Sequence, residues 1–204
     1  MHVAIAGNIG VGKTTLAGLL AKHYDWETNY EDIDDNPYLD DFYKDMKAWA
    51  FNLQVFFLHS RLKNIMNIHN SGKNVVQDRT IYEDAYIFAP NLHQMELMAT
   101  RDFETYFSLF RQVEKLLQPP DLLIYLKASI PTLVRRIQSK GREYENAIRI
   151  DYLDSLNRRY DTWIKSYDLG KVLVIDTDSV NFIDDPEGLN SVITKIDAEL
   201  YGLF

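Results

Sequence analysis

One short stretch near the start of the chain constrains its fold more than any other feature: it reads Gly7-Asn8-Ile9-Gly10-Val11-Gly12-Lys13-Thr14. The stretch has the pattern G-x-x-x-x-G-K-T of a phosphate-binding loop, or P-loop. The apolar run 2–6 before it predicts a buried strand, and residues 15–23 after it have the apolar spacing of a helix. In this context, backbone N–H groups and the positive end of the helix dipole face a polyphosphate. The sequence therefore predicts that the chain binds a nucleoside triphosphate.

The loop also predicts how the nucleotide is held. Lys13 is expected to reach the β- and γ-phosphates, and the hydroxyl of Thr14 is expected to ligate Mg²⁺. ATP is the expected nucleotide. The other predicted contacts to its phosphates come from Gly7, Asn8, Ile9, Gly10, Val11, Gly12 and Thr15.

The rest of the chain alternates between predicted strands and helices. Further strands are expected at residues 27–31, 74–78, 121–126 and 171–176. The expected helices cover residues 38–46, 47–70, 82–89 and 102–117, a segment from Pro131 onward, and residues 148–167 and 187–200. This order predicts an α/β fold of three layers, in which helices cover both faces of a five-stranded parallel sheet and ligands bind beyond the carboxyl ends of the strands. With 204 residues and no linker-like tract, the chain is expected to form one domain, residues 1–204.

Amino-acid composition limits the kinds of molecule that the chain is expected to bind. The formal net charge of -8 argues against a nucleic-acid polymer, although a mononucleotide needs only a few local cations. The absence of cysteine excludes disulfides and zinc–cysteine sites. No stretch approaches a membrane span and the start lacks a signal-peptide pattern, so a cytoplasmic protein without a membrane partner is expected.

Charged residues follow two of the predicted strands. Glu31 ends the strand 27–31, and Asp78-Arg79 ends the strand 74–78. A carboxylate there suits proton abstraction from an attacking hydroxyl or the binding of metal-bound water, and an arginine suits phosphate. The alternative for Glu31 is a surface position within an acidic run. Because the guanine-reading motif Asn-Lys-x-Asp is absent, these residues favour a small-molecule kinase over a GTPase.

A second cluster of cations lies after Pro131. The side chains of Arg136, Lys140 and Arg142 are spaced so that a helix end and a turn bring them to one anion. Mobile cations of this kind stabilise the charge on a phosphoryl group during transfer. We therefore expect an arginine-rich lid at about residues 136–146. The alternative is a solvated basic helix end that its own dipole favours.

Several motifs occur together in one order. They are the P-loop with Thr15, Glu31 with Asn36-Pro37, Trp49 with Gln54, Asp78-Arg79-Thr80, and Lys140-Gly141-Arg142. In this combination the chain resembles the deoxyribonucleoside kinases of the deoxycytidine, deoxyguanosine and deoxyadenosine type, over about residues 1–185. The resemblance implies ATP-dependent phosphorylation of the 5′-hydroxyl of a deoxynucleoside. It favours deoxyadenosine, with deoxycytidine or deoxyguanosine as alternatives.

The resemblance also implies roles for the residues that hold the nucleoside. Glu31 matches the general base of the family, although Asp32 stands where the family has proline. Tyr43 and Glu145 match the pair that holds the 3′-hydroxyl. Gln54 matches the residue that pairs with the base, because an amide offers both a donor and an acceptor.

Further implied roles concern the 5′ position and the base pocket. Arg79 matches the arginine that steers the 5′-oxygen and the phosphate, with Asp78 near Mg²⁺, and Thr80 replaces the usual serine. Phe88 matches the aromatic residue that stacks on the base. Arg61 and Asp84 match a pair that accompanies preference for deoxycytidine and purine deoxynucleosides, and a structural salt bridge is the alternative.

Two other functions remain open at this point. One is a nucleoside monophosphate kinase of the thymidylate kinase type, which needs extra cations for the acceptor phosphate. The other is a P-loop regulator that binds nucleotide without transfer. The aromatic-rich segment 47–70 and the helix after Tyr82 indicate a helical subunit interface, and the resembling enzymes are homodimers.

Overall fold

The computed structural model describes residues 1–30, 36–140 and 148–202, and it contains the predicted five-stranded parallel sheet. The strands lie in the order β2-β3-β1-β4-β5. Their bounds are β1 (His2–Gly7), β2 (Glu27–Asn29), β3 (Val75–Asp78), β4 (Leu122–Lys127) and β5 (Lys171–Asp176). In the described residues β2 ends at Asn29, earlier than the predicted 27–31.

The first strand lies at the centre of the sheet, and all six of its residues are buried, five of them apolar or glycine and the sixth the buried His2. Ile5 lies opposite Asp78 of β3 on one side and Ile124 of β4 on the other. The P-loop therefore leaves the sheet at its middle. The carboxyl end of β3, with Asp78, lies directly beside it.

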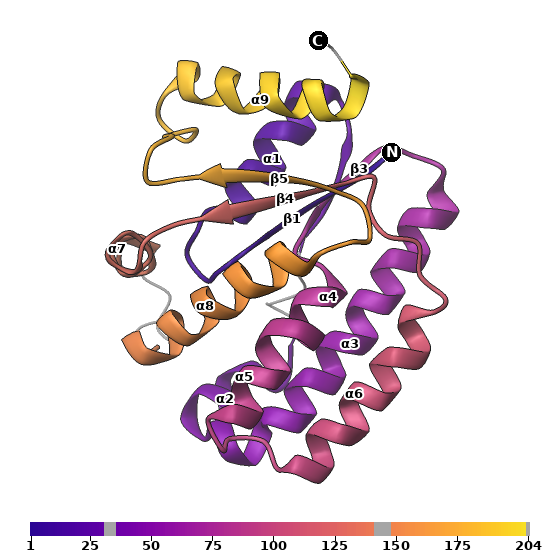
Figure 1. Cartoon of the computed structure of the whole chain (residues 1–204), viewed down its shortest axis with the longest axis vertical. Coiled ribbons are helices and arrows are strands. Elements are labelled where there is room, and N and C mark those ends of the chain that lie inside the picture. Colours follow the sequence, from indigo (N-terminus) through magenta and orange to yellow (C-terminus); the bar gives the residue numbers. More distant parts are fainter. Residues whose placement is uncertain (31–35, 141–147, 203–204) are drawn as a thin grey trace.

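Helices cover both faces of this sheet (Figure 1). The helices are α1 (Lys13–Tyr24), α2 (Leu39–Lys44), α3 (Met46–Ser71), α4 (Ile81–Glu83), the π-helical turn η1 (Asp84–Phe88), α5 (Ala89–Gln94), α6 (Thr100–Glu114), α7 (Ile130–Lys140), α8 (Ile150–Ser166) and α9 (Pro186–Tyr201). Within the described ranges, every helix is too short or too polar to traverse a bilayer.

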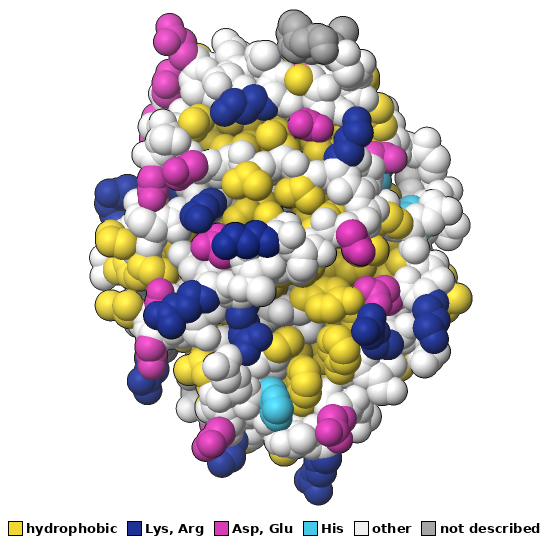
Figure 2. All heavy atoms as spheres, viewed as in Figure 1, with side chains coloured by type: hydrophobic (Ala, Val, Ile, Leu, Met, Phe, Trp, Pro, Cys, Tyr) yellow, Lys and Arg dark blue, Asp and Glu magenta, His cyan; other side chains and the backbone are white. Residues whose placement is uncertain are grey.

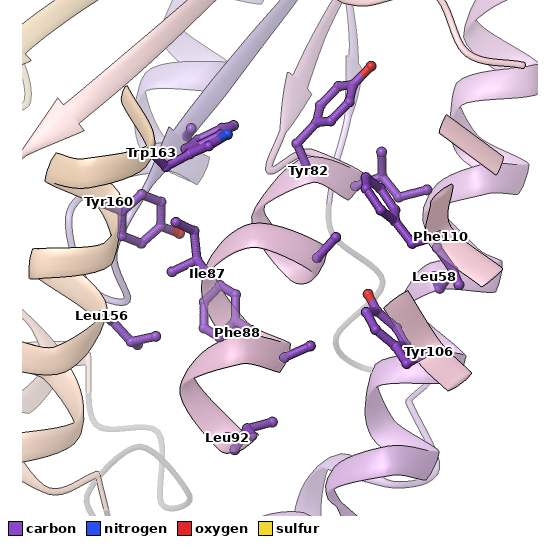
Figure 3. Close-up of a cluster of buried hydrophobic side chains, with 14 of the residues drawn as sticks. Leu58, Tyr82, Ile87, Phe88, Leu92, Tyr106, Phe110, Leu156, Tyr160 and Trp163 are labelled. Carbon is purple, nitrogen blue, oxygen red and sulfur yellow. The ribbon is translucent and has the colours of Figure 1, made fainter. Parts of the chain in front are cut away.

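The two faces of β1 belong to two separate cores. Val3 and Ile5 pack in one cluster with residues of α1 and α9. Ala4 and Ala6 belong to the other, which α8, η1, α3 and α6 complete. Figure 3 shows this second cluster, with side chains of α8 and of the α4–η1–α5 helix pointing toward one another. The alternation follows from the two-residue period of a strand.

The predicted helix at 82–89 differs from the observed one in length and form. The helical path runs from Ile81 to Gln94, and its middle, Asp84–Phe88, is a π-helical turn. Such turns are rare and frequently lie at functional sites. This one carries both Asp84 and Phe88, which face the cavity described next.

Candidate active site

A cavity lies between the P-loop, the helices α2 and α3, and the carboxyl end of β3. Its lining residues come from six parts of the chain. They are Ile9, Gly10, Gly12, Lys13 and Thr14 of the P-loop, Leu39, Phe42 and Tyr43 of α2, Leu53, Gln54 and Phe57 of α3, Arg79, Asp84 and Phe88 after β3, Lys140 of α7 and Tyr152 of α8. The cavity thus brings together the residues predicted to bind phosphate and the residues predicted to bind a nucleoside.

The loop has the backbone that a phosphate site requires. Gly10 and Gly12 have φ values of +80° and +106°, in the region that glycine adopts without strain. A Cβ atom on Gly10 would lie 2.6 Å from the side chain of Ile137, so the position also lacks space. The Nζ of Lys13 lies 2.9 Å from the carbonyl oxygen of Gly7 and 3.2 Å from that of Asn8.

Other predicted loop residues do not line the cavity. The amide of Asn8 donates to the carbonyl of Leu153 (2.9 Å) and to Oδ1 of Asn157 (2.7 Å), so it ties the loop to α8. Val11 is part of the core. Gly7 and Thr15 are also outside the lining. Side-chain contact with phosphate is thus supported for Lys13 and Thr14, whereas the rest of the loop offers backbone.

Oxygen ligands suitable for a divalent cation meet beside the loop. The hydroxyl of Thr14 donates to Oδ2 of Asp78 at 2.5 Å. The other carboxylate oxygen, Oδ1, is buried and has no hydrogen-bond partner among the residues that the structure describes. Hydroxyl and carboxylate oxygens are the ligands that Mg²⁺ prefers, so this pair fits the predicted metal.

Arg79 adopts an unusual backbone conformation at the edge of the cavity. Its φ value is +69°, a left-handed conformation that costs a non-glycine residue about 1–2 kcal/mol. The guanidinium carbon lies 4.5 Å from the ring centroid of Phe88. The arginine predicted to act at the 5′-oxygen therefore contacts the aromatic residue predicted to stack on the base.

At the other end of the cavity, Gln54 and Asp84 are both buried lining residues. The Oε1 atom of Gln54 has no hydrogen-bond partner in the described part of the chain. Arg61 forms an ion pair with Asp84, with both side chains almost fully buried, and its guanidinium lies 5.1 Å from the ring of Phe57. Arg61 is not itself part of the lining, so Asp84 is the member of the pair that a ligand would meet.

The lid cations differ in their placement. Lys140 lines the cavity. Arg136 instead donates to the carbonyl of Val11 (2.9 Å) and to the hydroxyl and carbonyl of Thr177 (2.8 and 3.0 Å). These bonds join α7 to the P-loop and to the segment after β5, and contact between Arg136 and phosphate stays a prediction.

Three predicted site residues, Glu31, Arg142 and Glu145, lie outside the residues that the structure describes. Tyr43, in contrast, lines the cavity as expected from its assigned position beside the sugar.

Two buried residues near the site were not predicted. Tyr152 lines the cavity, and burial raises the pKa of its hydroxyl, which keeps it neutral. In the sequence Tyr152 lies in the predicted helix 148–167, where no motif distinguishes it. Glu83 contacts both the P-loop and Thr80. Its sequence signal was the spacing T-x-x-E of a helix capping box, from Thr80 to Glu83.

Comparison with known proteins gives one consistent result. The sequence matches the profile of the family described as deoxynucleoside kinase over residues 3–201. It is 36% identical to the deoxyadenosine/deoxycytidine kinase of Bacillus subtilis (strain 168), across 95% of this chain and 90% of that protein. It is 38% identical to the deoxyadenosine kinase of Dictyostelium discoideum, across 94% of this chain and 77% of that protein. A solved structure of deoxyadenosine kinase from M. mycoides with dCMP and dCDP superposes with a TM-score of 0.87 at 30% identity, covering 97% of this chain and 100% of that one.

Proposed function

Since the chain belongs to the deoxynucleoside kinase family and phosphorylates a deoxynucleoside, we propose that it transfers the γ-phosphoryl group of ATP to the 5′-hydroxyl, with deoxyadenosine as the preferred acceptor. One observation carries the proposal: a single cavity is lined by Lys13 and Thr14 at one part and by Gln54 and Asp84 at another. Donor and acceptor sites would therefore share one cavity, with Arg79 also in its lining.

The donor side of the reaction is assigned to the P-loop and its neighbours. Lys13 and the backbone of the loop bind the ATP phosphates, and Thr14 and Asp78 hold Mg²⁺. When bound, Mg²⁺ neutralises charge that develops on the phosphate oxygens. Arg79 and Lys140 add positive charge from the side chains that line the cavity, and the same role is proposed for Arg136 and Arg142.

The acceptor side is assigned to the residues at the other part of the cavity. Glu31 takes the proton of the 5′-hydroxyl, and Tyr43 and Glu145 hold the 3′-hydroxyl. Gln54 pairs with the base while Phe88 stacks on it. Adenine and cytosine both carry an exocyclic amine, and a buried carboxylate such as Asp84 accepts from an amine. This chemistry suits deoxyadenosine and deoxycytidine alike, and the relatives named as deoxyadenosine kinases favour deoxyadenosine, with deoxycytidine or deoxyguanosine as alternatives.

We also propose a homodimer through α3 and α6, which lie side by side (Figure 1). Met66 of α3 and Leu109 of α6 are 54% and 48% exposed, and Leu116 just beyond α6 is 82% exposed. Figure 2 shows hydrophobic side chains that reach the surface between charged ones over the half of the molecule formed by these helices. Sedimentation of the wild type against Leu109→Glu tests the interface, and a monomeric wild type would refute it.

A substrate panel tests the proposed reaction. The four deoxynucleosides and their monophosphates are each incubated with ATP and Mg²⁺, and ADP release is measured. We expect turnover of deoxyadenosine first and no turnover of monophosphates, which a thymidylate-type kinase would use. The variant Glu31→Gln should lose turnover while it still binds the nucleoside; full activity would remove Glu31 from the role of base.

A further inference from the structure

Glu83 is a fully buried carboxylate that receives four hydrogen bonds. Its Oε1 accepts from the backbone N–H of Gly7 (3.2 Å) and from the hydroxyl of Tyr160 (2.7 Å). Its Oε2 accepts from the backbone N–H of Thr80 (2.7 Å) and from the hydroxyl of the same residue (3.3 Å). In Figure 3 the hydroxyl of Tyr160 points from α8 toward the α4–η1–α5 helix, and α4 ends at Glu83. A buried carboxylate needs hydrogen-bond donors to both of its oxygens, because a missing donor leaves the desolvation cost of that oxygen uncompensated.

The groups that Glu83 binds belong to the two halves of the proposed site. Gly7 is the last residue of β1 and the first of the P-loop, which binds the donor. Thr80 directly follows Asp78 and Arg79, which act at the metal and the 5′-oxygen. One carboxylate therefore joins the donor loop to the segment that serves the acceptor.

The bond to Thr80 has a particular consequence for Arg79. The left-handed conformation of Arg79 persists only if the surrounding structure holds it. The N–H of Arg79 donates to the carbonyl of Ile5 (3.0 Å), and the next N–H along the chain donates to Glu83. Glu83 thus fixes the backbone on the carboxyl side of Arg79.

We propose that Glu83 is a positioning residue for phosphoryl transfer, which fixes the P-loop and the segment Asp78-Arg79-Thr80 in register so that donor phosphate and acceptor oxygen meet. The inference rests on the roles proposed above for Asp78 and Arg79. Glu83 does not line the cavity and so does not touch the substrates. Its loss should therefore act on the rate of transfer and not on substrate affinity.

The test is the isosteric variant Glu83→Gln, in which one acceptor oxygen becomes an amide that cannot accept from an N–H group. We expect kcat to fall by about 30-fold or more, because a misplacement of about 1 Å costs on this order. The KM values for deoxyadenosine and ATP should change by less than about 3-fold, since both sites keep their own contacts. A kcat at the wild-type level would overturn the inference.

The matched control is Tyr160→Phe, which removes one donor to the same carboxylate and leaves the bonds to Gly7 and Thr80. This variant should lose thermal stability but keep its kcat. If both variants lose kcat in proportion to their loss of Tm, Glu83 is only structural and the inference fails.

If the Glu83→Gln protein does not fold, a second variant provides the test. Glu83→Asp keeps the charge but is shorter by one methylene, so it cannot bind Gly7 and Thr80 together. Its kcat should also fall with KM unchanged, and a wild-type kcat would overturn the inference. Wild-type enzyme that phosphorylates no nucleoside refutes the proposed function itself, whereas an active wild type beside an unimpaired Glu83→Gln refutes only the role of Glu83.

Discussion

The guanidinium carbon of Arg79 lies 4.5 Å from the centroid of the Phe88 ring, and both residues line the cavity. The distance is that of a cation–π contact. Phe88 therefore supports the arginine proposed to act at the 5′-oxygen as well as the base proposed to stack on it. If these proposed roles hold, base recognition and phosphoryl transfer share one aromatic side chain.

The variant Phe88→Leu should therefore affect both KM and kcat. Loss of the cation–π contact is expected to lower kcat by about 3- to 30-fold, in addition to a higher KM from lost stacking. Phe57→Leu is the matched control, because Phe57 lines the same cavity but contacts Arg61. Steady-state kinetics of both variants decide the matter. A change of KM alone in Phe88→Leu would show that Arg79 does not depend on the ring.

The buried pair Arg61–Asp84 should control both stability and substrate choice. Arg61→Leu removes the cation beside a buried carboxylate and should lower the free energy of unfolding by about 3–5 kcal/mol. Adding Asp84→Ala removes the charge as well and should recover most of that loss. The double variant should shift preference toward thymidine in the deoxynucleoside panel. An unchanged substrate profile in a folded double variant would make the pair structural.

The magnesium assignment predicts a specific defect in Asp78→Asn. The amide keeps the size of the side chain but removes the charge that attracts the cation. The Mg²⁺ concentration for half-maximal activity should rise by about 10-fold or more. Asp161→Asn, at a surface carboxylate paired with Lys127, is the control. Equal magnesium dependence of the two variants would place the metal elsewhere.

Tyr106 carries a buried hydroxyl without a hydrogen-bond partner among residues 1–30, 36–140 and 148–202. Burial is also the main reason that its pKa is raised well above the ordinary value. Because an unsatisfied hydroxyl costs desolvation energy, Tyr106→Phe should raise the free energy of unfolding by about 1 kcal/mol. Tyr86→Phe should lower it, since the hydroxyl of Tyr86 donates to Glu114 at 2.6 Å. Urea unfolding measures both, and a destabilised Tyr106→Phe would reveal a partner such as bound water.

Stability should decrease on the acid side of pH 6.5 because of His2. Burial lowers the pKa of its imidazole from 6.5, and nearby His69 acts in the same direction, against the opposing effects of Gln77 and Asp121. Below pH 6.5 the unfolded chain binds a proton at this residue that the folded chain does not, so the free energy of unfolding falls by up to about 1.4 kcal/mol per pH unit.

Urea unfolding at about pH 7.5 and about pH 5.5 measures this loss. The loss of unfolding free energy between the two pH values should be smaller in His2→Gln than in the wild type. His23→Gln, which removes an exposed imidazole, is the control and should keep the wild-type loss. An equal pH dependence in wild type and His2→Gln would contradict the assignment.

The predicted fold and family are confirmed, for reasons that particular residues make clear. The P-loop motif has a strand before it and a helix after it, and the apolar runs of β1 and β4 are typical of strands buried on both faces of a parallel sheet. Local patterns therefore sufficed for the sheet. The π-helical turn Asp84–Phe88 was not predicted. Its buried residues include the charged Asp84 as well as apolar ones, so the sequence there has no helical apolar period that would mark the turn.

The site was only partly accessible to the same reasoning. Lys13 was assigned from its own motif, and Gln54 and Phe88 from the family resemblance; all three line the cavity. The bonds of Arg136 could not, since its partner Thr177 lies 41 residues away and contributes a hydroxyl and a carbonyl with no pattern of their own. The spacing from Thr80 to Glu83 indicates at most a local helix cap, and only the folded chain brings Gly7 and Tyr160 to Glu83.

The small side chains of Ala4 and Ala6 have a consequence for protein engineering. They belong to the same core cluster as Leu156 and Tyr160 of α8, so their methyl groups help to set how deeply that helix sits on the sheet. The same helix carries Tyr152 in the cavity wall, and its Leu153 carbonyl and Asn157 side chain accept hydrogen bonds from Asn8 of the P-loop. Larger side chains at these two positions, introduced to gain stability, should therefore lower the turnover rate. Neither alanine lines the substrate cavity.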